Sequence, residues 1–342
     1  MFKARKRAAA CTASATTVAQ AGPGLARPRL AWRWGAGLLC AALAACQAPV
    51  RSPAVAQVPV SAGSPAAASA GQPAAEWRHV SIALPSGESL RAHWWPAEGT
   101  QAEPRPAVVA LHGCGGLYAQ GERLSQRYRE TAARLHAAGY SVLLPDSFGS
   151  RGLRSICSTR YGARDVTVAV RAQDARAALQ WLAARPGVEA RRIGVLGWSN
   201  GATTALNLLE QRRLHPAPGD VPLAGVAVFY PGCGPLQRRH AVLEPAPLLM
   251  QLGALDDWTP AQPCMDFADA LQRRAGSDVM LKVYADSYHG FDGTAPVRVR
   301  ADVPNGTSAQ GVHEGGNPVA RAQALAALDG FWTRTLGAGK QP

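Results

Sequence analysis

Short apolar runs alternate with amphipathic stretches along most of the chain from residue 107 onward. The apolar runs, typical of buried strands, occupy residues 108–111, 141–145, 193–197, 226–230, 248–252 and 279–284. Helical periodicity marks residues 122–138, 165–184, 202–211, 260–274 and 320–335. Apolar strands that are separated by helices form parallel sheets with both faces covered. We therefore predict an α/β domain with a mostly parallel, doubly wound sheet and helices on both faces.

The chain has a different pattern before this alternation begins. Residues 80–84 and 90–95 are strand-like and are joined by a turn at Ser86 and Gly87. Residues 47–75 consist almost entirely of Ala, Pro, Ser, Val, Gly and Gln, a composition that cannot bury a core. We therefore expect a flexible tether over residues 46–75 and one folded domain over residues 76–342.

The positive charge of the chain is concentrated near its first residue. With 47% hydrophobic residues, the 342-residue chain has the composition of a globular protein. Seven of its 36 Lys and Arg residues lie within residues 1–45, which hold no acid, and without them the net charge falls from +13 to +6. Because a targeting signal explains this basic segment, we expect no nucleic-acid partner.

The basic segment ends at Arg33 and is followed by an apolar run over residues 34–45. This run is too short to span a bilayer but suits the apolar region of a signal peptide. It ends in LAAC, and Cys46 resembles the lipidated cysteine of bacterial lipoproteins; ordinary cleavage near Cys46 is the alternative. Gln47 replaces the aspartate associated with inner-membrane retention. We expect a signal peptide over residues 1–45 and export to the periplasmic side of the envelope, with a lipid anchor in the outer membrane as the one membrane contact.

The sequence GWSNG at residues 197–201 lies directly between an apolar strand and a helical stretch. A serine nucleophile in this position stands on a tight turn that leaves no room for side chains two residues to either side. Gly197 and Gly201 supply that room. The pattern therefore predicts Ser199 as the nucleophile of a serine hydrolase.

A serine nucleophile needs a base, and the base needs a carboxylate that orients it. His289 follows the last predicted strand, at the carboxyl edge of the sheet, where it can meet Ser199. His313, in the long loop before the last helix, is the alternative base. The preceding strand is followed by two carboxylates, Asp256 and Asp257, and the second of these is also a candidate for capping the next helix.

Acyl transfer also needs backbone donors for the oxyanion. The glycine-rich stretch HGCGG begins at His112, directly after a predicted strand, and lets backbone N–H groups approach a ligand closely. We expect the amides of Cys114 and Asn200 to form the oxyanion hole, with Gly113 as the neighbouring alternative. An ordinary glycine-rich turn is the plainer interpretation.

Four cysteines lie in the predicted domain, namely Cys114, Cys157, Cys233 and Cys264. An even number in an exported protein permits two disulfides, and three pairings are possible. Cys233 and Cys264 both follow strands that we expect to be neighbours, which favours that pair over the others; free buried thiols are the alternative. None of the four has the spacing of metal ligands, so we expect no metal.

Six stretches occur together in one order: HGCGGL at 112, PDSFGSRG at 145, GVLGWSNG at 194, FYPGCG at 229, GALDDWTP at 253 and YHGFD at 288. With them the chain resembles the dienelactone hydrolase family from residue 76 to 336. The resemblance implies a monomeric, esterase-like α/β hydrolase that forms an acyl-enzyme and needs no metal or organic cofactor. It also makes Asp256 the triad acid, because this residue stands third after the glycine of GALDDWTP. The founding enzymes use a cysteine nucleophile, so Ser199 favours ordinary small-molecule esters or lactones as substrates.

Substrate contacts are indicated at two places. Arg151 follows a strand at the carboxyl edge and is a candidate partner for an anionic substrate group, or else part of a solvated basic face. Trp198 and Trp258 flank the nucleophile and the acid, and they line either an acyl pocket or the core. A peptidase or acyltransferase with the same triad and a non-catalytic periplasmic binding protein are the alternative functions.

Overall fold

The computed structural model describes residues 77–97 and 103–337 of the chain. The predicted signal peptide, Cys46 and the tether lie outside the described residues. Within the two described ranges, no helix combines the length and the apolar character that a membrane crossing requires.

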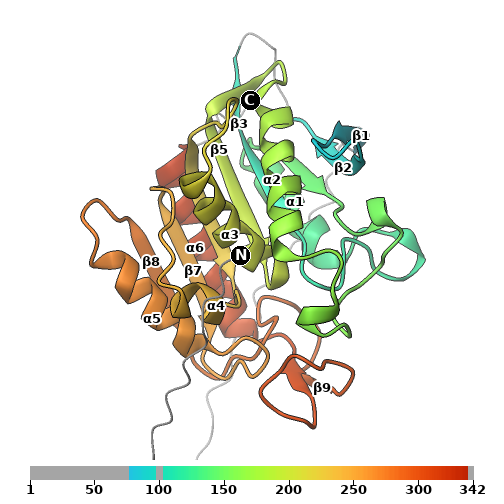
Figure 1. Ribbon diagram of the computed structural model, residues 1–342, viewed down its shortest axis with the longest axis vertical. Coiled ribbons are helices and arrows are strands. Elements are labelled where there is room, and N and C mark those ends of the chain that lie inside the picture. Colours follow the sequence, from blue (N-terminus) through green and yellow to red (C-terminus); the bar gives the residue numbers. More distant parts are fainter. Residues whose placement is uncertain (1–76, 98–102, 338–342) are drawn as a thin grey trace, which may run out of the picture. The chain divides into compact units, whose positions relative to one another are not determined.

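An eight-stranded sheet forms the centre of the domain (Figure 1). Its strands are β1 (Arg78–Ala83), β2 (Ser89–Trp95), β3 (Arg105–Leu111), β4 (Ser141–Pro145), β5 (Val188–Trp198), β6 (Leu223–Phe229), β7 (Leu248–Gly253) and β8 (Val279–Tyr284). Their order across the sheet is β1-β2-β4-β3-β5-β6-β7-β8. The strand β2 is antiparallel to both of its neighbours, and all other pairs are parallel. The predicted, mostly parallel sheet is therefore confirmed, and the carboxyl ends of β3 to β8 share one edge.

Helices cover both faces of this sheet. They are α1 (Gln126–Ala137), α2 (Val168–Ala183), α3 (Asn200–Leu214), α4 (Gly234–Arg238), α5 (Ala261–Gln272) and α6 (Pro318–Leu336). Along β3, Val109 and Leu111 belong to the apolar cluster that contains α2, α3 and α5, whereas Val108 and Ala110 belong to the cluster that contains α1 and α6. This alternation follows from the two-residue period of a strand and gives the sheet two buried faces.

The connections after the strands carry the remaining elements. They hold three 3₁₀ turns, η1 (Gln120–Glu122), η2 (Gly149–Arg151) and η3 (Tyr161–Ala163), and the hairpin of β9 (Arg298–Arg300) and β10 (Val312–Glu314). The helix predicted from residue 122 begins four residues later because Glu122 has a left-handed φ of 60° within η1. We did not predict the hairpin, because strands of three residues are too short to show a period of two.

Two of these connections, residues 153–167 and 298–314, meet each other and are called the cover segments below. The side chain of Asn305 accepts a hydrogen bond from the Tyr161 amide at 3.1 Å and donates one to the Thr159 carbonyl at 2.9 Å. Both segments contribute to a third apolar cluster, formed by Cys114, Phe148, Ile156, Cys157, Val166, Trp258, Val303 and Val312. The cover segments are thus packed against the loops that follow β3 and β7.

Candidate active site

Ser199 occupies a sharp turn between β5 and α3. Its φ of 52° is in the left-handed region, which costs free energy in a residue other than glycine and is typical of functional sites. A Cβ atom added to Gly201 would lie 2.1 Å from the carbonyl oxygen of Leu111, and one added to Gly197 would lie 2.6 Å from that of Gly201. The glycines therefore let the turn pack directly on the end of β3, as the GxSxG pattern requires.

Hydrogen bonds connect the three residues predicted as nucleophile, base and acid. The hydroxyl of Ser199 lies 2.9 Å from Nε2 of His289, and Nδ1 of His289 lies 2.8 Å from Oδ2 of Asp256. The tautomer with its proton on Nδ1 satisfies both contacts, since Nδ1–H then donates to Asp256 and Nε2 accepts from Ser199. Asp256 and His289 are 5% and 3% exposed, so this chain of bonds is shielded from water.

The turn after β7 holds the carboxylate of Asp256 in place. The backbone amides of Trp258 and Thr259 donate to its Oδ1 at 2.9 and 2.8 Å, and the Thr259 hydroxyl donates to Oδ2 at 3.0 Å. The ring centroids of Trp258 and Tyr230 each lie 4.5 Å from the ring centroid of His289. Trp258 belongs to the loop after β7 and Tyr230 to the loop after β6. The carboxylate of Asp256 and the imidazole of His289 are therefore held in place by surrounding protein groups.

The alternative acid and base pair with each other. Nδ1 of His313 lies 2.7 Å from Oδ2 of Asp257, and the backbone amide of His313 donates to Oδ1 at 2.8 Å. The ring of His313 stacks on Tyr288, with centroids 4.7 Å apart. This pair fastens a cover segment to the loop after β7. The helix α5 begins at Ala261 with Pro260 as its N-cap, so Asp257 does not cap it.

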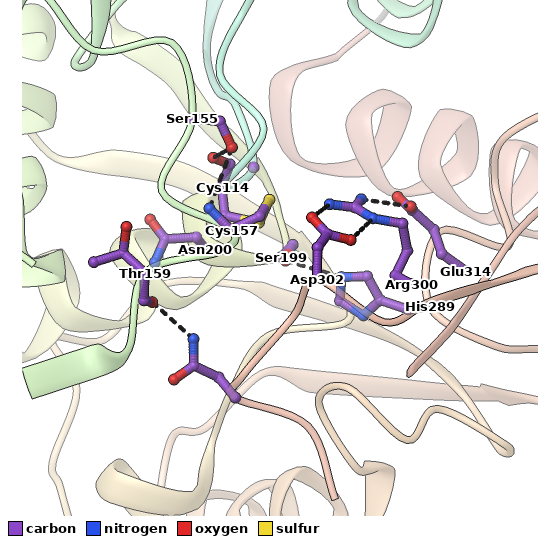
Figure 2. The surroundings of a disulfide bond; sticks show 12 residues. Cys114, Ser155, Cys157, Thr159, Ser199, Asn200, His289, Arg300, Asp302 and Glu314 are labelled. Atoms are coloured by element: carbon purple, nitrogen blue, oxygen red, sulfur yellow. Dashed lines mark hydrogen bonds and ion pairs between the residues drawn. A yellow bond between two sulfur atoms is a disulfide. The ribbon is translucent and has the colours of Figure 1, made fainter. Parts of the chain in front are cut away.

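The two residues expected to supply the oxyanion donors line the same cavity as Ser199. Figure 2 shows Cys114 and Asn200 close to Ser199, with His289 on the other side. The amide of the alternative donor, Gly113, donates instead to the hydroxyl of Tyr128 at 2.8 Å. Cys114 and Asn200 therefore fit the expected role better than Gly113 does.

A disulfide and two hydrogen bonds fix the backbone at Cys114. Cys114 is bonded to Cys157, and its carbonyl oxygen accepts from the amide of Ile156 at 2.9 Å and from the hydroxyl of Ser155 at 3.2 Å (Figure 2). The loop after β3 is thus attached to a cover segment. The second disulfide joins Cys233 and Cys264, which confirms the pairing that the strand order favoured.

The cavity at Ser199 has a volume of about 380 Å³. The residues that line it are Cys114, Tyr161, Arg164, Thr167, Val168, Ser199, Asn200, Thr203, Gly232, Cys233, Gly234, Pro235, Trp258, Thr259, Pro260, Pro263 and Asn305. Arg164 is the only charged residue in this described lining. A larger cavity of about 430 Å³ lies elsewhere, against β1 and β2, and contains none of the three hydrogen-bonded residues. We assign the site by its chemistry rather than by cavity size.

The structure corrects two predicted substrate contacts. Arg151 does not line the cavity, because both terminal nitrogens of its guanidinium bind the carboxylate of Asp174 at 2.9 Å; this buried acid on α2 requires a counterion. Trp198 does not line it either, since its side chain is 2% exposed and its Nε1 donates to Asp292 at 2.9 Å. Trp258, which was predicted with it, does line the cavity.

We did not predict the buried carboxylate of Asp292 as part of the site. It accepts from the Nε1 of Trp198 and, at 2.7 Å, from the hydroxyl of Tyr230, and it lies 3.2 Å from Nε of Arg127. Burial raises the pKa of Tyr230 well above its usual value, which keeps this phenol a neutral donor. Asp292 thereby links Trp198, the residue before Ser199, to Tyr230, whose ring packs on that of His289. The sequence feature that could have identified Asp292 is its position in the YHGFD stretch.

Within residues 77–97 and 103–337, no three His, Cys, Asp or Glu side chains come together in a way that could hold a metal ion.

Residues 96–311 match the family model described as the Dienelactone hydrolase family. Two uncharacterized proteins of Mycobacterium tuberculosis, MT2364 of strain CDC 1551 / Oshkosh and Rv2307c of strain ATCC 25618 / H37Rv, are each 31% identical to the chain over 194 residues. The match covers 53% of this chain and 63% of each relative, so the chain spans less than two thirds of their length.

Solved structures with a similar backbone include two hydrolytic enzymes. Esterase 2 of Thermogutta terrifontis, phosphoramylated by tabun, is 19% identical with a TM-score of 0.54, over 78% of this chain and 97% of that chain. The dienelactone hydrolase-like promiscuous phosphotriesterase P91 from metagenomic libraries is 21% identical with a TM-score of 0.54, over 76% of this chain and 98% of that one. At these identities the likeness shows the fold, and it confirms the predicted α/β-hydrolase fold.

Proposed function

The chain belongs to the dienelactone hydrolase family, and from this premise we propose that it is a hydrolase that cleaves carboxylic esters or lactones through an acyl-enzyme on Ser199. The observation that carries the proposal is the unbroken hydrogen-bonded chain from Ser199 through His289 to Asp256. A binding protein has no need for such a chain next to a strained serine and two candidate oxyanion donors.

In the first step the hydroxyl oxygen of Ser199 attacks the ester carbonyl, and Nε2 of His289 takes its proton. Asp256 holds the imidazole in the required tautomer and stabilises the imidazolium that forms. The carbonyl oxygen becomes negatively charged and accepts hydrogen bonds from the amides of Cys114 and Asn200. His289 then gives its proton to the leaving alcohol, and the acyl group stays on Ser199. With a lactone, the alcohol remains attached to the acyl group.

In the second step a water molecule attacks the acyl-enzyme. His289 takes a proton from this water, the same two amides bind the new oxyanion, and collapse returns the proton to Ser199 while the carboxylic acid leaves. The cavity, which contains Trp258 and several prolines, suits an apolar acyl or alcohol group of modest size. We propose small-molecule esters or lactones as substrates and a monomer as the active form.

The first experiment is covalent labelling with a fluorophosphonate probe, which reacts with activated serines. The wild-type protein should form an adduct at Ser199, identified by peptide mass spectrometry. Ser199→Ala and His289→Gln should form none, because one removes the nucleophile and the other removes the base. His313→Gln is the matched control and should still be labelled, since His313 pairs with Asp257 away from the cavity.

Two outcomes would redirect the proposal. A folded wild-type protein without any adduct would favour the non-catalytic binding protein instead. An adduct at Ser199 with cleavage of p-nitroanilide amides but not of the matching p-nitrophenyl esters would favour a peptidase.

A further inference from the structure

Arg171 is a buried cation that binds the side chain of Asn200, a residue of the cavity lining, without lining the cavity itself. It belongs to α2 and is only 1% exposed, on the helix face that also buries Ala172, Ala175 and Leu179. Among the described residues, no carboxylate forms an ion pair with it. The acid nearest in sequence, Asp174, binds Arg151 through both of its oxygens.

The guanidinium of Arg171 joins the two segments that carry the expected oxyanion donors, the start of α3 and the loop after β3. One terminal nitrogen donates to the side-chain oxygen of Asn200 at 2.5 Å, and the other donates to the carbonyl oxygen of His112 at 2.7 Å. The ring of Phe148 lies beneath it, with the guanidinium carbon 4.9 Å from the ring centroid. Asn200 supplies one expected donor itself, and His112 stands two residues before Cys114, which supplies the other. The side chain of Arg171 thus bridges the start of α3 and the loop after β3, in addition to the direct packing of Gly201 on the end of β3.

Arg171 forms no ion pair among the described residues, and the carboxylates of Asp174 and Asp146 stabilise its charge only through longer-range attraction. Burial lowers its pKa to about 10, so the guanidinium is still protonated at neutral pH. Burial and the charge on Arg171 together hold the pKa of His112 well below its usual value, so the neighbouring imidazole is neutral and adds no second charge. A buried, unpaired charge costs several kcal/mol of stability in general. In such a low-dielectric place it also favours negative charge that develops nearby.

Resting on the proposed hydrolase function, we propose that Arg171 is a positioning residue for the oxyanion hole: it holds the amides of Cys114 and Asn200 at their spacing and stabilises the oxyanion electrostatically from behind them. It touches neither the substrate nor Ser199. Its effect should therefore appear in the transition state and not in the binding of the substrate.

The test compares Arg171→Met, which keeps an unbranched chain but removes the charge and both hydrogen bonds, with Arg171→Lys, which keeps the charge. We expect Arg171→Met to lower kcat about 10- to 100-fold with KM within about threefold. The affinity for a boronic acid, which forms a charged tetrahedral adduct on the serine, should fall by a similar factor. Arg171→Lys should lose less of both.

Arg212→Met is the matched control. Arg212 is also a buried arginine, 4% exposed, but it pairs with Glu244 at 2.7 Å and donates to the carbonyl of Val221, away from the cavity. This variant should lower the melting temperature while kcat stays within about twofold of wild type.

A folded Arg171→Met with kcat within about threefold of wild type would overturn the inference, and so would a loss of kcat without loss of boronic acid affinity. If this variant does not fold, Arg171→Lys decides. An unchanged kcat in Arg171→Lys would show that the two hydrogen bonds from the guanidinium to Asn200 and His112 do not position the oxyanion hole. A wild-type protein without ester hydrolysis or probe labelling would instead contradict the proposed function, which separates the two failures.

Discussion

At the scale of single residues, side chains that are adjacent in the sequence make contacts in different parts of the molecule. Asp256 orients His289, while Asp257 holds His313 in a cover segment. Trp198 points into the core, although it directly precedes Ser199. Sequence reasoning located the positions at the sheet edge correctly, because strand ends fix where a backbone lies. It failed for Arg151 and Trp198, because the direction of a side chain depends on partners that are distant in sequence, Asp174 and Asp292.

His93 in β2 makes the stability of the fold depend on pH. It is 6% exposed, and burial, followed by the charges of His79 and Arg91, lowers its pKa from 6.5 to about 4. The unfolded chain therefore binds the proton more tightly than the folded one does. The free energy of unfolding should be insensitive to this group above pH 6.5 and should fall as the pH drops from 6.5 toward 4.

His93→Gln tests this by removing the titration while keeping a polar partner for the hydroxyl of Tyr118, which lies 2.9 Å from Nε2 of His93. Urea unfolding of both proteins at about pH 7.5, 5.5 and 4.5 should show a smaller fall in the variant. The pKa of His112 is also lowered in the folded state, so this residue too reduces the free energy of unfolding at acidic pH. Because both proteins contain His112, its contribution is the same in each and does not affect the comparison. Equal falls would mean that His93 does not carry the effect.

At the scale of elements, the sequence predicted the regular structure better than the connections. The eight strands of the sheet and the five longer helices follow periods of apolar residues, so the pattern revealed them. The hairpin of β9 and β10 and the meeting of the cover segments depend on single contacts such as Asn305 with Thr159 and Asp257 with His313. Single contacts between distant residues produce no repeating pattern of apolar positions in the sequence, so the sequence does not predict them. These contacts complete the wall of the cavity.

The disulfide between Cys114 and Cys157 belongs to this wall. It closes a loop with a sequence separation of 43 residues, and removing it in Cys114→Ala/Cys157→Ala should lower the free energy of unfolding by roughly 2–4 kcal/mol. The variant should also lose kcat, because the loop that carries the Cys114 amide is then held only by its hydrogen bonds.

Cys233→Ala/Cys264→Ala provides the comparison. That disulfide has a separation of 31 residues, so its removal should cost similar stability. Chemical unfolding gives the stability of both variants, and kcat is measured far below both melting temperatures. A loss of kcat that is no larger for the first pair than for the second would contradict an anchoring role at the oxyanion loop.

At the scale of the whole molecule, we propose that the domain is exported and held at the periplasmic face of the outer membrane by a lipid on Cys46. Cells that express the full chain with labelled palmitate should incorporate label into the wild type and not into Cys46→Ala, because the thiol is the attachment point. Ser199→Ala, which changes only the domain, should be labelled like the wild type. Label that persists in Cys46→Ala would exclude this anchor.

The order of strands also determines when the site can form. Ser199 follows β5 in the interior of the sheet, Asp256 follows β7, and His289 follows β8, which is the edge strand. Parallel neighbours of this kind pair only after a long connection closes, and such contacts form slowly during folding. The imidazole of His289 reaches the hydroxyl of Ser199 only when the outermost strand has docked. If the protein has the proposed esterase activity, its recovery during refolding should therefore report the completion of the sheet, later than signals from the tryptophans of its interior.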